Sequence, residues 1–214
     1  MSTLVRASEL AKRPVVTFAG EDVAQVKDVV FALGGGEISA FTLAGRGLFA
    51  GPLKSVLPWE AVAGLGPDAV MIASEDALRP VAEMFGDAPG AGAAGSGDVI
   101  RSEVLTDDGT SLGRVVDVVI GIRDGGGGQG DVVGYEIDPA ESLGRGKQPL
   151  LIPLPDTMAA SGQHLIVPAA ARNYLTDNLA GFGSAVDSFR TQMSGSGSAG
   201  SAPLSVDRPS EDRS

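Results

Sequence analysis

Short apolar runs, separated by glycine and polar clusters, make up most of the sequence. The run Val15–Phe18 is followed by a turn signal at Ala19–Asp22, and a segment rich in valine covers residues 23–30. The glycine triplet at 34–36 then precedes a strand-like segment over residues 37–43. Apolar runs between tight turns are typical of antiparallel strands, so we predict a mainly β protein.

The same pattern occurs twice along the chain. Residues 20–30 match residues 109–119 without a gap, which aligns Asp28 with Asp117. The other matched pairs are Arg6–Leu10 with Ile100–Val104, Ile38–Phe41 with Val132–Tyr135, Leu57-Pro58 with Ile152-Pro153, and Val70–Ile72 with Leu165–Val167. The copies lie roughly 90 residues apart, which is too long for a solenoid unit and suits a duplicated small domain.

Two segments are poor in large apolar residues and divide the chain. Residues 87–97 consist mainly of glycine and alanine, which predicts a flexible linker. Serine, glycine, proline and charged residues dominate residues 194–214, which predicts a disordered tail. We therefore expect one domain over residues 1–86 and a second over residues 98–193.

Helical patterns follow each copy. Residues 80–85 predict a short helix that ends at Gly86, and residues 168–180 predict a helix that ends at Gly181. A further short helix is expected to start at Ser184. The apolar side of the C-terminal helices is formed by Leu175, Leu179, Phe182, Val186, Phe189 and Met193. Either this side caps the second domain or it docks a partner.

Residue types needed for catalysis and metal binding are scarce. The chain has no cysteine and one histidine, His164, which excludes a zinc site of cysteines and histidines and a cysteine nucleophile. The glycine-rich segments 34–36 and 125–130 lack the Gly-Lys-Ser/Thr of a phosphate-binding loop. We expect no enzymatic activity, no cofactor and no bound metal.

The aspartates have local structural interpretations. Asp28 and Asp117 hold matching positions in separate copies, so each is expected to cap a turn or to pair with a nearby cation rather than to share one site. Four loop aspartates do not have the spacing of an EF-hand and are expected to form a solvated acidic rim. They are Asp107, Asp108, Asp124 and Asp131.

The charge and hydropathy of the chain limit the classes of partner that we expect. A formal net charge of −11 repels nucleic acids, and the 16 lysines and arginines form no cluster, so we expect no direct nucleic-acid contact. No uninterrupted apolar stretch approaches the length of a transmembrane helix, and the N-terminus has no signal-peptide pattern. We expect a soluble, cytoplasmic protein.

The repeated pattern resembles the PRC-barrel family, named for the cytoplasmic barrel of the photosynthetic reaction centre H subunit. Residues 113–118, Gly-Arg-Val-Val-Asp-Val, fit the family's glycine-containing segment, whereas the first copy has Ala24 in place of the usual glycine. Residues 57–62 and 66–72 resemble the family's last segments. The resemblance covers about residues 4–73 and 99–168. It implies a compact antiparallel barrel in each copy, no catalytic residues, and a role in assembly, docking or regulation.

These patterns predict an all-β protein with two tandem small antiparallel β-barrel domains and short C-terminal helices. The expected function is a non-enzymatic protein-binding, scaffold or adaptor module. The resemblance leaves two alternatives: a factor linked to ribosome or RNA maturation that acts through a protein partner, or a peripheral subunit that docks on a membrane complex. The two copies either present their loops separately or pack together as one pseudo-symmetric unit.

The most suggestive stretch for binding a partner is Arg46–Leu53. Leu48 and Phe49 lie between Gly47 and Gly51, where a loop would expose them. The matching residues of the second copy, 142–148, are polar apart from one leucine. An exposed apolar pair can anchor a partner. The alternative is that both side chains fold back under the end of the barrel with Trp59.

Replacing both Leu48 and Phe49 with serine distinguishes these alternatives. Exposed anchors would leave the fold intact, and their loss would weaken partner binding by about 2 kcal/mol or more. Buried core residues would instead lower the melting temperature sharply, because deletion of a buried leucine or phenylalanine side chain costs about 2–5 kcal/mol. The measurement is a thermal melt, and a large drop in melting temperature would contradict the interface hypothesis.

Overall fold

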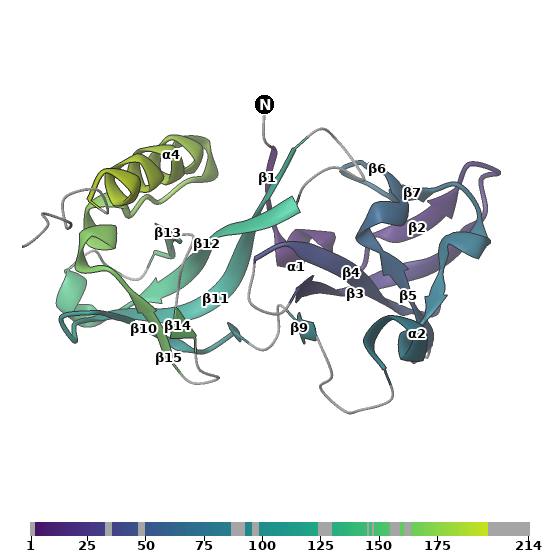
Figure 1. Cartoon of the computed structure of the whole chain (residues 1–214), viewed down its shortest axis with the longest axis horizontal. Coiled ribbons are helices and arrows are strands. Elements are labelled where there is room, and N and C mark those ends of the chain that lie inside the picture. Colours follow the sequence, from purple (N-terminus) through teal and green to yellow (C-terminus); the bar gives the residue numbers. More distant parts are fainter. Residues whose placement is uncertain are drawn as a thin grey trace, which may run out of the picture.

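The chain forms two curled β-sheets, one for each copy of the repeat (Figure 1). The computed structural model describes residues 3–32, 36–46, 50–86, 93–95, 99–123, 130–144, 146, 148–154, 159–160 and 164–196. The predicted fold, two tandem β-barrel units with C-terminal helical structure, is confirmed. Each sheet also contains one parallel pair of strands, β2 with β7 and β10 with β15.

The first sheet follows the order β6-β7-β2-β3-β4-β5-β8, and β9 pairs with β3 outside this path. Its strands are β2 (Pro14–Thr17), β3 (Asp22–Ala32), β4 (Ile38–Ala44), β5 (Pro52–Pro58), β6 (Val62–Leu65), β7 (Val70–Ile72), β8 (Arg79–Pro80) and β9 (Ala93–Gly95). The helical turns around it are α1 (Ala7–Leu10), η1 (Trp59–Ala61), η2 (Glu75–Ala77) and α2 (Val81–Phe85).

The second sheet follows the order β13-β12-β11-β10-β15-β14, and β1 pairs with β11 outside this path. Its strands are β1 (Thr3–Arg6), β10 (Glu103–Thr106), β11 (Ser111–Ile122), β12 (Gly130–Pro139), β13 (Leu150–Pro153), β14 (Ala159–Ala160) and β15 (His164–Val167). Helical structure follows as η3 (Glu141–Leu143), η4 (Ala169–Tyr174) and α4 (Leu179–Ser196).

Equivalent strands of the two copies pair in the same register. Val15 lies opposite Ala24 in the first copy, and Val104 lies opposite Gly113 in the second. A bulge interrupts β3 immediately before Asp28, and another interrupts β11 immediately before Asp117. The duplication read from the sequence is therefore a duplication of structure.

One landmark of the predicted repeat is wrong. Lys12 and Arg101 are equivalent: both have positive φ, 69° and 75°, and their N–H groups donate to the carbonyls of Val26 and Val115 at 2.7 and 2.8 Å. This register matches Leu10 with Val99, not with Val104. The alignment followed the Ser-Glu pair that both segments contain. The two Ser-Glu pairs are not at equivalent positions, because different residue types form the common backbone turn.

The main apolar core continues from one copy into the other. Phe41 and Leu57 of the first copy and Leu112 and Ile137 of the second are fully buried members of one cluster. Burying each such side chain contributes about 1.5–3 kcal/mol relative to leaving it exposed. Of the two predicted arrangements, the copies adopt the single pseudo-symmetric unit.

A helix covers the outer face of each sheet. In the first copy this face is formed by Val30, Ala40 and Val56, against which Met84 and Phe85 of α2 pack. In the second copy it is formed by Val119, Val133 and Leu151 with Phe182 and Val186 of α4. Each helix therefore closes the sheet that precedes it in the sequence.

The C-terminal helix differs from the prediction in its bounds. Gly181 does not end a helix; it lies in the first turn of α4, where its N–H donates to Asn178 Oδ1 at 2.9 Å. Asn178 is thus the cap that starts the helix. Leu175 and Phe182 are 8% and 0% exposed, so these two residues cap the second sheet. The helix extends to Ser196, and residues 197–214 of the predicted tail lie outside the described residues.

The two copies exchange their N-terminal strands. β1 belongs to the first copy but pairs antiparallel with β11, from Thr3 opposite Ile122 to Arg6 opposite Val119. β9 lies within the segment predicted as a linker and pairs antiparallel with β3 of the first copy. Each sheet is thus completed by backbone from the other copy.

Gly113 has a conformation that glycine alone adopts easily. Its φ is 137°, and a Cβ atom there would lie 2.1 Å from the Asp138 carbonyl oxygen. The equivalent residue of the first copy is Ala24, which already carries a Cβ. At this position the two copies therefore have different backbone conformations, although their strands pair in the same register.

We predict that Gly113→Ala lowers the free energy of unfolding by about 2–4 kcal/mol, because it adds both backbone strain and a steric clash. The matched substitution Ala24→Gly removes a methyl group without a clash and is expected to cost about 1 kcal/mol. Urea denaturation of both variants measures the difference. Equal losses of stability would contradict the strained geometry at Gly113.

Candidate functional site

Three polar side chains meet on the outer face of the second sheet. Ser111 Oγ donates to Glu103 Oε1 at 2.8 Å, and His164 Nε2 lies 3.9 Å from Glu103 Oε2. The carboxylate therefore stands between the hydroxyl and the imidazole. A serine hydrolase requires the imidazole in the middle, where it can remove the hydroxyl proton. This arrangement does not activate Ser111 as a nucleophile.

The same serine lies in a motif that the sequence interpretation wrongly took to be absent from the chain. Residues 109–113, Gly-Thr-Ser-Leu-Gly, have the Gly-x-Ser-x-Gly form of a nucleophile elbow. An elbow is a sharp turn from a strand into a helix, whereas this segment leads from the β10–β11 turn into strand β11. The motif matches in its residues but not in its structure.

Asp28 and Asp117 lie at bulges within strands β3 and β11, and not at the turns that were predicted for them. Each accepts a hydrogen bond at 2.8 Å from the N–H of the following residue, at the bulge of its own strand. They lie in different sheets and do not form one site. Within the described residues, no group of three acidic or histidine side chains is placed to hold a metal ion.

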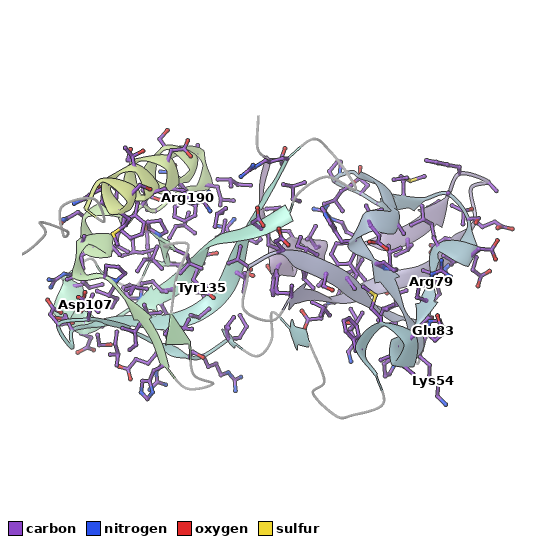
Figure 2. The ribbon with its side chains drawn as sticks, viewed as in Figure 1. Lys54, Arg79, Glu83, Asp107, Tyr135 and Arg190 are labelled. Carbon is purple, nitrogen blue, oxygen red and sulfur yellow. The ribbon has the colours of Figure 1, made fainter. Side chains whose placement is uncertain are left out.

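Asp107 and Asp108 do more than form a solvated rim. Asp107 Oδ1 accepts from the Ala169 N–H at 2.9 Å, and Asp108 Oδ2 accepts from Arg172 Nη2 at 2.9 Å. The Thr106 hydroxyl and the Thr110 N–H donate to Asp108, and these bonds lower its pKa to about 2. Both aspartates therefore tie the β10–β11 turn to η4, at the end of the second lobe (Figure 2).

The two remaining aspartates of the predicted rim are placed differently. Asp124 lies outside the described residues. Asp131 forms an isolated antiparallel bridge with Glu37, and this bridge joins the two copies. The predicted acidic rim is therefore not one surface.

Phe18 is the most exposed large apolar side chain among the described residues, at 67%. It holds the place of Asp107: the Phe18 N–H donates to the Ile72 carbonyl, as the Asp107 N–H donates to the Val167 carbonyl. The sequence interpretation counted Phe18 as the last residue of a strand, but β2 ends at Thr17. The first copy thus presents an aromatic ring where the second copy closes its turn.

The predicted binding residues Leu48 and Phe49 lie outside the described residues, so their role stays a prediction. The structure places the residues around their loop. Arg46 Nη2 forms an ion pair with Asp22 Oδ2 at 3.2 Å, which joins the base of the loop to the strand that follows the Phe18 turn. Arg46 and the Phe18 turn therefore belong to one end of the first copy.

Trp59 is buried at the junction of the two copies. Its ring meets Phe41 edge-on, with ring centroids 5.7 Å apart, and a Cβ atom on Gly130 would lie 3.0 Å from Trp59 Cζ2. Gly130 belongs to β12 of the second copy. The tryptophan therefore packs between the copies.

Two hydrogen-bonded pairs also cross the junction. The Arg6 guanidinium donates to both carboxylate oxygens of Glu136, and this contact raises the pKa of Arg6 above its ordinary value. Ser8 donates to Asp117 through its hydroxyl and, at 3.2 Å, through its N–H. Burial raises the pKa of the nearby Tyr135 on β12 to about 12 (Figure 2). The Arg6–Glu136 and Ser8–Asp117 contacts therefore hold the two copies together.

The bonds at Asp108 predict a pH-dependent contribution to stability. Its folded-state pKa lies below its ordinary value of 3.8, so the charged form stabilises the fold above that pH and the contribution falls as the pH drops toward 2. We expect Asp108→Asn to melt below the wild type at about pH 6 and the gap to close near pH 2. The control is Asp187→Asn on α4. A gap that does not change with pH would contradict the assignment.

The comparisons with known proteins agree with this geometry. The family profile described as PRC-barrel domain matches residues 2–78 and again residues 93–173. A search of curated proteins finds no match. In the described part of the chain, no helix is both long and apolar enough to cross a membrane. Because the two matches cover most of the chain and follow the two structural copies, this protein belongs to the PRC-barrel domain family and carries two such domains in tandem.

Proposed function

We propose that this chain is a non-enzymatic, cytoplasmic protein-binding module that acts as an adaptor or scaffold. Its recognition surface is the end of the first repeat that carries Phe18 and Arg46, and Leu48 and Phe49 remain predicted anchors. The observation that carries this proposal is the exposure of Phe18, 67%, in a turn whose counterpart in the second repeat is closed.

An exposed aromatic ring is a strong anchor for a protein partner. A phenylalanine side chain buries a large apolar area at a small cost in conformational entropy, and aromatic residues dominate many interfaces. The second repeat cannot bind in the same way, because Asp107 and Asp108 hold the equivalent turn against η4. The difference between the repeats supports recognition by the first repeat alone.

The charges around Phe18 indicate the chemistry of the partner. Glu21 follows it in the turn, and Glu75 and Asp76 lie on η2, directly after the strand whose last residue bonds to the Phe18 N–H. All three acidic residues are exposed. We infer a partner with an apolar pocket for the ring and basic residues at the rim of that pocket, since complementary charges favour encounter and register.

The proposal is tested by photo-crosslinking in the cells that make the protein. We expect benzoylphenylalanine at position 18 to form an adduct with one discrete protein, and the same probe at Val116, a 44% exposed residue of the second repeat, to form none. Phe18→Ser should weaken the recovered complex by roughly 30-fold, the effect of losing a hot spot of about 2 kcal/mol. Its unfolding free energy should change by about 0.5 kcal/mol or less.

The identity of the adduct distinguishes the roles that the family allows. A ribosomal protein would indicate a maturation factor, and a subunit of a membrane complex would indicate peripheral docking. Equal adducts from positions 18 and 116, or none from either, would contradict the proposed surface.

A further inference from the structure

The exchanged strands obey a two-fold relation between the repeats. Arg6 of β1 lies opposite Val119, and Gly95 of β9 lies opposite Val30. Val30 and Val119 are equivalent, since each is the second residue after the aspartate of its bulge. Each repeat therefore gives its N-terminal strand to the same place on the other.

A second contact lies on the two-fold axis itself. Glu37 and Asp131 each immediately precede an equivalent residue of β4 or β12, Ile38 or Val132, and they bridge to one another. The Val132 N–H donates to the Gly36 carbonyl at 2.8 Å beside this bridge. Equivalent residues face each other in this way in an isologous interface, the kind found between the subunits of a symmetric dimer.

The polar contacts of the junction are not symmetric, and they select which repeats pair. Arg6 and Ser8 come from the first repeat, and their partners Glu136 and Asp117 come from the second. The residue of the first repeat at the place of Glu136 is Thr42, because Thr42 pairs with Asp28 as Glu136 pairs with Asp117.

Pairing of two first repeats would lose the Arg6–Glu136 contact, although Ser8 would still meet Asp28, the equivalent of Asp117. Two first repeats would place Thr42 opposite Arg6. Two second repeats would leave Asp117, 8% exposed, and Glu136 without the arginine and serine that they bond, since the place of Arg6 is held by Gly95. A largely buried carboxylate without its partners is unfavourable, and such a loss discriminates against a wrong partner.

We propose that the junction is a selective pairing surface, in which a first repeat recognises a second repeat, and that a second copy of this chain can supply either one by reciprocal strand exchange. Within one chain the short linker gives the two repeats a high effective concentration, so the monomer forms first. The contacts themselves need no peptide connection between the repeats. This inference is independent of the Phe18 surface.

The test uses the full chain with a protease site inserted in residues 87–92, cut after folding. Native mass spectrometry at micromolar concentration is expected to show the two fragments as a one-to-one complex. Fragments that separate at that concentration would overturn the proposal.

Charge reversal tests the selecting pair. We expect Arg6→Glu to weaken the association of the fragments at least tenfold and the double variant with Glu136→Arg to restore most of it. The control is Arg46→Glu, which breaks the ion pair of Arg46 with Asp22 within one repeat. An Arg6→Glu variant that associates like the wild type, or a control that loses association equally, would overturn the selecting role.

Isotope-labelled and unlabelled cut chains, mixed in urea and refolded together, test the partner. Complexes of one first-repeat and one second-repeat fragment are expected, with about half of them drawn from both preparations. Dimers of like fragments at equal abundance would overturn the selectivity. If refolding fails, the same exchange is followed between native cut preparations, where complexes that never mix would overturn the role of a second copy.

Discussion

Backbone hydrogen bonds along one edge of β11 constrain the whole arrangement of the chain. Strand β10 pairs only with Ser111–Arg114, so the later part of that edge needs another strand, and β1 occupies it from Val119 to Ile122. Unpaired backbone groups there would be costly inside the structure or prone to aggregation at its surface. β3 has the same requirement and is completed by β9. Neither sheet is complete by itself.

The two joined repeats differ in their turns and in the helices that cover their sheets. The second repeat uses its turn aspartates, its glycine at position 113 and the long helix α4 to build a closed lobe. The first repeat has the short helix α2 over its sheet and leaves Phe18 exposed. The two repeats therefore share a strand arrangement but differ in how their turns are held.

Local patterns predicted the repeat, the strands and the family, because apolar runs and turn residues act over a few positions. The start of α4 was misplaced because Gly181 was weighed as a helix breaker and Asn178 was not weighed as a cap. The strand exchange was not predictable, because local sequence patterns do not show which strand β1 pairs with, and its partner β11 lies in the other copy. Phe18 was missed for a related reason: whether a residue ends a strand or begins a turn depends on pairing that the sequence does not display.

The exchange of β1 also bears on how the protein is made. Arg6 is synthesised 130 residues before its bonding partner Glu136. During that interval the first repeat has its own sheet but an unplaced N-terminal strand, and it is at this stage that an incomplete chain would pair wrongly or aggregate. A chain that stops before β11 therefore lacks the pairing partner of β1 as well as the missing residues.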